Sequence, residues 1–158
     1  MTNRTEKTDP YSRIPWVYVT REQAHAHPKG RLGPLLYAIA AFLILSGAVK
    51  LYVFLSAGAP LWMVLMSGLL PIAAGLGLLA RMPFALVLTI LLAGLTLFFA
   101  ILGMRDLSEP GVSTVERVLP LIDALVSAGI CFYLMDADRP NLIYRHRYRK
   151  YSALKEGP

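Results

Sequence analysis

The chain has 158 residues, of which 56% are hydrophobic and 16% are charged. This composition excludes an ordinary soluble domain, in which about a quarter of the residues are charged. The formal net charge is +6, and the basic residues gather in the two tails, which favours contact with anionic lipid over nucleic acid. The single cysteine, Cys131, excludes an intramolecular disulfide framework and a cysteine-rich metal site.

The N-terminal tail, residues 1–34, contains two local signals. The apolar and aromatic stretch 14–19 (IPWVYV) suits the headgroup interface of a membrane. Thr20 and Gln23 fit a capping box that opens a short helix, which must end before Pro28. We therefore expect a short interfacial segment in this tail.

Four apolar segments follow, and each is long enough to cross a bilayer as a helix, which takes about twenty residues. The short connection between the first two segments makes them antiparallel neighbours. Pro83 suits the first turn of the third helix, where its missing N–H costs little. The predicted fold is therefore an all-α integral membrane four-helix bundle over residues 35–135, with spans at 35–55, 61–80, 84–104 and 118–135.

The distribution of Lys and Arg predicts the orientation of this bundle. Thirteen of these residues lie in the two tails and the turn at Arg81, whereas the loop 105–117 on the opposite side carries two. By the positive-inside rule both termini lie in the cytoplasm, with the C-terminal tail at residues 136–158. The expected location is the inner membrane of a bacterium.

Lys50 and Asp123 are the only charged residues inside the predicted spans. Both lie five residues from the outer end of a span, so both are about 7–8 Å below the same surface. They could form an intramembrane ion pair that closes the bundle. Two alternatives remain open, namely that each side chain reaches the headgroups or a water pocket independently, and that Asp123 relays a proton or an ion.

Small and special residues predict how the second span packs. Ala73 and Gly77 are spaced one turn apart, which permits close helix contact within the bundle or with a partner. Pro71 lies in the middle of the span and predicts a kink.

Aromatic and basic residues alternate directly after the fourth span. Their position beside the membrane favours docking on anionic lipid, and a landing site for a cytoplasmic partner is an alternative. The residues concerned are Arg145, Arg147, Tyr148, Arg149, Lys150 and Tyr151.

No catalytic residue, cofactor or metal site is predicted. The three histidines, His25, His27 and His146, lie in the tails and lack a third ligand at a metal-binding spacing, so we expect them to be solvated. None of them falls within a span, which argues against a haem carrier with paired axial histidines.

Two stretches, 46–51 (SGAVKL) and 75–81 (GLGLLAR), resemble parts of the DoxX-like four-helix membrane proteins of bacteria. The similarity covers the first three spans, and the two long tails lie outside it. The resemblance implies a four-helix inner-membrane bundle that is sometimes an accessory to a redox complex, and it supplies no catalytic residue.

The favoured function is that of a small accessory or scaffold protein that packs against a larger membrane complex and docks on anionic lipid through its tails. Its expected partners are other membrane proteins or further copies of itself. A small transporter or channel that uses Asp123 and Lys50 is the alternative. A membrane enzyme acting on lipid or quinone ranks third, because no nucleophile, base and orienting group cluster in the sequence.

Overall fold

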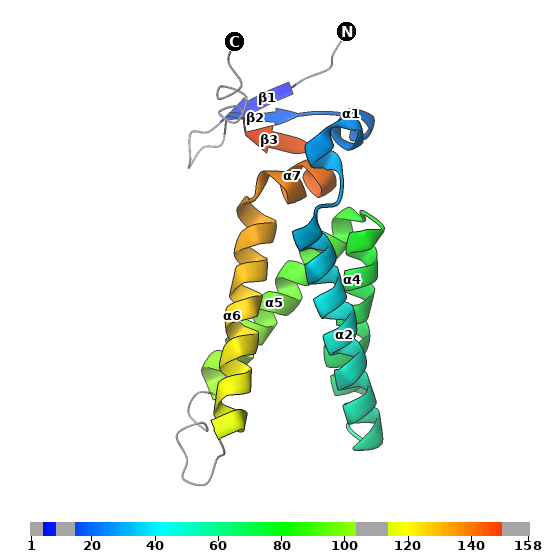
Figure 1. Cartoon of the computed structure of the whole chain (residues 1–158), viewed down its shortest axis with the longest axis vertical. Coiled ribbons are helices and arrows are strands. Elements are labelled where there is room, and N and C mark those ends of the chain that lie inside the picture. The colour runs from blue at the N-terminus through cyan, green and yellow to red at the C-terminus, as the bar shows by residue number, and fades with distance from the viewer. Residues whose placement is uncertain (1–4, 9–14, 104–113, 150–158) are drawn as a thin grey trace.

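The computed structural model describes residues 5–8, 15–103 and 114–149. The chain forms four long helical segments. A small cap of strands and short helices lies at one end of them (Figure 1). Each apolar segment predicted from the sequence is helical. The segments are α2 (Pro34–Ser56), the continuous run α3 (Leu61–Met63), η2 (Val64–Leu69) and α4 (Leu70–Leu79), α5 (Pro83–Gly103), and α6 (Thr114–Asp136).

Three helical stretches of the described residues are long and apolar enough to cross a membrane. They are Pro28–Ser56, Leu61–Leu79 and Pro83–Leu102, with mean hydropathies of 2.2, 1.9 and 2.7. At most 33% of any of these stretches is buried inside the fold, so most of their apolar surface faces outward. This combination indicates association with a membrane. The predicted loop 105–117 falls mostly outside the described residues, and α6 begins at Thr114, earlier than predicted.

The long helices pack in a series rather than in a closed ring. α2 contacts η2 and α4, α4 contacts α5, and α5 contacts α6. α2 and α6, at the two ends of the series, diverge with distance from the cap (Figure 1). The side on which these two helices face each other is therefore the open side of the molecule.

A π-helical turn, η2, precedes Pro71, the residue at which the sequence predicted a kink. Pro71 has no N–H to donate to the preceding turn, and such a defect can be absorbed by a wider turn. At the end of η2 the N–H of Leu70, the first residue of α4, donates to the carbonyl of Leu65, five residues earlier. The π turn packs against α2.

Glycines allow α2 to approach η2 and α4 closely. A Cβ added at Gly47 would lie 2.8 Å from the carbonyl oxygen of Gly68, and one at Gly75 would lie 2.8 Å from that of Ala40. Gly77 likewise packs against Ala85 of α5, whereas Ala73 is exposed. The close contacts of α4 are therefore made by Gly75 and Gly77, and Ala73, the other residue of the predicted pair, lies outside them.

The cap joins the two tails of the chain. β1 (Thr5–Thr8), β2 (Pro15–Tyr18) and β3 (Arg147–Arg149) form an antiparallel sheet in the order β1-β2-β3, in which Trp16 is opposite Arg149. The sequence predicted an all-α fold with a separate segment in each tail, and the structure differs from this prediction in that the two tails form a sheet. Its strands have only three or four residues, and β3 lies beyond all four long helices in the sequence, so no local alternation could reveal the pairing.

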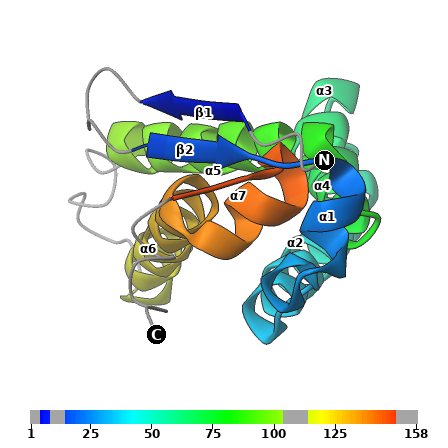
Figure 2. The same ribbon diagram turned by 90° about the horizontal axis from the view of Figure 1, so that it is seen from above.

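Short helices complete the cap and fix it to the long ones. α1 (Arg21–Ala26) begins with the predicted capping box of Thr20 and Gln23, and η1 (Pro28–Gly30) follows. α7 (Asp138–Arg145) lies over the ends of the long helices between α6 and α2 (Figure 2). The buried hydroxyl of Tyr144 donates to the carbonyl of Leu78, 2.8 Å away, which anchors α7 on the end of α4.

Candidate functional site: the groove between α2 and α6

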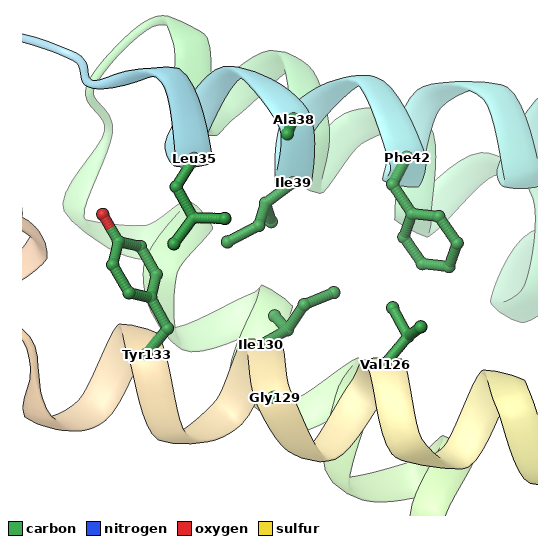
Figure 3. Close-up of a pocket in the computed structure, with 8 residues that line it drawn as sticks. All are labelled: Leu35, Ala38, Ile39, Phe42, Val126, Gly129, Ile130 and Tyr133. Atoms are coloured by element: carbon green, nitrogen blue, oxygen red, sulfur yellow. The ribbon is translucent and has the colours of Figure 1, made fainter.

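An apolar groove of about 400 Å³ lies between α2 and α6 (Figure 3). Each helix contributes four residues at the spacing i, i+3, i+4, i+7, which places them on one helical face. The Tyr133 hydroxyl is the only polar side-chain group among them. The lining residues are Leu35, Ala38, Ile39 and Phe42 of α2, and Val126, Gly129, Ile130 and Tyr133 of α6.

The groove exists because α2 and α6 are each held by a different neighbour. Gly47 and Gly75 bring α2 close to η2 and α4, as described above, while α6 packs on α5. Gly129 adds space on the α6 side, since a Cβ built there would meet no atom within 4 Å. The groove is therefore a product of the helix arrangement and of one missing side chain.

The end of the groove away from the cap is followed by an ion pair. Lys50 Nζ lies 3.4 Å from Asp123 Oδ2, so the structure brings together the two charged residues singled out in the sequence. Their side chains are 43% and 34% exposed, so neither charged group is fully buried by the protein. The pair links α2 to α6.

The end of the groove nearest the cap has a different chemistry. Arg139, in the first turn of α7, lies against Gly33, where an added Cβ would be 2.2 Å from the guanidinium Nη1. Gly33 directly precedes α2 and lies two residues before Leu35, which lines the groove. The ion pairs of the described residues are Lys50–Asp123 and Arg149–Asp136, so Arg139 has no carboxylate partner in this part of the chain.

The aromatic and basic segment after α6 makes contacts within the cap. The guanidinium carbons of Arg147 and Arg149 lie 4.3 and 5.2 Å from the centre of the Trp16 ring. Arg149 also pairs with Asp136, and Arg145 and Arg147 both donate to Oδ1 of Asn141. Tyr148 is half-buried in β3, and Lys150 and Tyr151 lie outside the described residues.

Burial and the charge of Arg147, in that order, lower the pKa of Arg145. Desolvation thus acts on the guanidinium of Arg145 even though it stays charged at physiological pH. The arginines of the basic segment therefore make contacts that stabilise the cap.

Two of the three histidines meet in the cap. The rings of His25 and His146 are edge to face with their centres 5.9 Å apart, and His27 Nδ1 accepts from the Lys29 N–H. Burial first, and then the proximity of His25 and Arg21, lower the pKa of His146. No group of three His, Cys, Asp or Glu side chains that could hold a metal ion occurs in the described part of the chain.

Comparisons of the chain with protein-family models, with curated proteins and with solved structures find no match. The resemblance to DoxX-like proteins stays a prediction.

The groove and its polar end were not predicted from the sequence, although a signal was present. The two lining faces have the same spacing, but apolar faces of this kind occur on every helix of a membrane protein, so spacing alone does not say which two are left unpacked. The position of Arg139 beside Gly33 depends on the path of α7, which the sequence does not show.

Proposed function

We propose that the protein is a small accessory or scaffold protein of a bacterial inner membrane, which packs laterally against a larger membrane complex. In this proposal α2, the run α3–η2–α4, α5 and α6 all cross the bilayer, and the cap lies in the cytoplasm.

One observation carries the proposal, namely that all four helical segments direct large apolar side chains outward. In water such surfaces would be costly, whereas lipid tails and the helices of a partner solvate them well. Examples that are more than half exposed are Leu45, Tyr52, Trp62, Phe84, Phe99, Leu125 and Phe132.

Two further observations support the orientation. β1 and β3 belong to one sheet at one end of the molecule, as an even number of crossings requires. The excess of thirteen Lys and Arg over two on the cap side favours the cytoplasm for that side.

The chemistry of the groove favours binding over catalysis. Among its lining residues only Tyr133 offers a polar side-chain group, and a reaction needs at least a reactive group and a partner that activates it.

The topology is tested by cysteine labelling in a Cys131→Ala background. Ala26→Cys places a thiol in the cap and Ala57→Cys places one in the turn between the first two spans, and both positions are exposed. A membrane-impermeant maleimide applied to intact spheroplasts is expected to label the thiol at 57 and to label the one at 26 only after permeabilisation. Labelling of both thiols in intact spheroplasts would contradict the proposed crossing.

The accessory role is tested by crosslinking in native membranes, purification in mild detergent and identification of the proteins recovered. A larger membrane complex in stoichiometric amount is the expected result. Recovery of the chain alone, or only with further copies of itself, would contradict the role.

A small transporter that uses Asp123 and Lys50 is the second candidate, and the partial exposure of both side chains favours it. Flux through proteoliposomes that is lost in a folded Asp123→Asn variant would support transport. Loss of protein stability without any measurable flux in the wild type would support a structural pair.

A further inference from the structure

The groove is short and close to the cap. Along each helix its lining residues extend over eight positions, from Leu35 to Phe42 and from Val126 to Tyr133, which is about 10 Å of helix axis. A single leaflet of the hydrocarbon core is about 15 Å thick. If the helices cross the membrane as proposed, the groove lies within the leaflet on the cap side.

The shape of the groove favours a thin flexible ligand over a protein helix. A helix is about 10–12 Å wide and needs about 30 Å to cross the membrane, so it would meet the lining residues over only a third of its length. A volume of about 400 Å³ is instead in the range of pockets that hold small molecules. An acyl chain can enter from the side, because the groove is open between α2 and α6.

The polar groups near the groove specify the other end of the ligand. Figure 3 shows the Tyr133 hydroxyl at the end of the groove where Leu35 lies, which is the end nearest the cap. Arg139 lies against Gly33, two residues before Leu35, and has no carboxylate partner within the described residues. A guanidinium and a hydroxyl together suit a phosphate group, which accepts several charge-assisted hydrogen bonds.

We propose that the groove binds one acyl chain of an anionic phospholipid from the cap-side leaflet, and that Arg139 and Tyr133 hold its phosphate. The lipid fills the open side of the bundle and links α6 and α7 to α2. This inference rests on the proposed function in one respect, namely that α2 and α6 cross the membrane with the cap at its surface.

The test uses the full-length protein in nanodiscs made from equal amounts of phosphatidylglycerol and phosphatidylcholine. After transfer to mild detergent, native mass spectrometry counts the lipids that stay bound to each chain. The wild type is expected to retain one phosphatidylglycerol in preference to phosphatidylcholine by about tenfold, because the latter carries no net negative charge.

Two variants change the site, and each has a matched control. Gly129→Leu fills the groove, whereas Gly94→Leu adds the same side chain to α5, where an added Cβ also meets no atom within 4 Å. Arg139→Gln removes the cation, whereas Arg21→Gln removes an exposed arginine elsewhere in the cap. A second groove variant, Ala38→Leu, covers the case in which Gly129→Leu does not fold.

We expect Gly129→Leu and Ala38→Leu to retain at least tenfold less bound lipid than the wild type. Arg139→Gln should retain the two lipids in equal amounts. Both control variants should match the wild type. Equal retention of the two lipids by the wild type, or full retention of phosphatidylglycerol by a folded groove variant, would overturn the lipid site. The maleimide labelling tests only the topology. If the labelling agrees with the proposed topology and either of these two lipid results is found, the lipid site is wrong and the accessory role still stands.

Discussion

Among single residues, Lys50 and Asp123 are the two whose removal has the clearest expected outcome. Each charge offsets the other between α2 and α6, so removing one leaves its partner uncompensated. We expect Asp123→Leu and Lys50→Met to lower stability by roughly 1–3 kcal/mol each, and the variant that combines the two substitutions to recover much of the loss. Thermal unfolding in detergent measures all three. Losses that simply add would show that the two side chains act independently.

His146 gives the cap an expected dependence on pH. Burial, His25 and Arg21 lower its pKa in the folded state below the usual 6.5, so the unfolded chain takes up the proton first as the pH falls. The stability of the cap is therefore present above about pH 7 and falls progressively through the region below 6.5. Urea unfolding followed by the fluorescence of Trp16, in a Trp62→Phe background, measures this dependence.

The matched variant for this measurement is His146→Asn. His146 has a φ of 51°, a left-handed conformation that asparagine tolerates better than most residues. This variant should keep the cap folded and flatten the pH dependence. An unchanged dependence would assign the titration to another group.

Among the elements, α4 carries the contacts that decide how the bundle packs. A side chain at Gly75 would meet the Ala40 carbonyl and Ile44, so Gly75→Leu should push α2 away and cost about 1–3 kcal/mol. Ala73→Leu adds a side chain to an exposed position on the same helix and should have little effect. Thermal unfolding of the two variants compares them directly. A larger loss of stability for Ala73→Leu would show that α4 packs through Ala73, as the sequence predicted.

The helices themselves could be predicted because each is a long, continuous apolar segment of the sequence. The bounds of α2 and α5 differ from the predicted ones by only one residue at each end. The packing of each helix is harder to predict, since Ala73 and Gly75 belong to the same run of small residues and only the position of α2 separates them. The π turn before Pro71 is a similar case, because the sequence marks the missing N–H but not the way in which the chain absorbs it.

At the scale of the whole molecule, the cap and the helices should be separable in stability. Trp16 is buried beneath Arg147 and Arg149, so Trp16→Ala removes a cation–π contact of about 0.5–2 kcal/mol together with its apolar burial. We expect trypsin to cut this variant after Arg145, Arg147 and Arg149 in proteoliposomes that expose the cap, while the long helices stay protected. Mass spectrometry of the fragments identifies the cuts.

Trp16→Phe is the matched control for this experiment, because it keeps an aromatic ring under the two arginines. This variant should resist trypsin more than Trp16→Ala does. Equal cleavage of the two variants and the wild type would contradict a role for Trp16 in holding the cap together.

The cap and the groove are the parts of the fold that the sequence could not supply. Both bring together residues from the two ends of the chain, as in the contacts of Trp16 with Arg147 and of Gly33 with Arg139. The sequence did single out Lys50 and Asp123, because both lie five residues from an end of a predicted span, and the structure brings their side chains together. It could not show that Arg139 lies at the open side of the bundle, since this depends on the path of α7.

The pairing of β2 with β3 also has a consequence for how the protein is made. β2 leaves the ribosome before any long helix, whereas β3 is synthesised only after the last of them. Until then β2 can pair only with β1, Trp16 lacks the arginines of β3, and Tyr144 cannot yet reach α4. The sheet therefore closes last, and a chain that stops short of β3 carries an unpaired strand edge and an uncovered tryptophan, which are features that chaperones and proteases recognise in incomplete proteins.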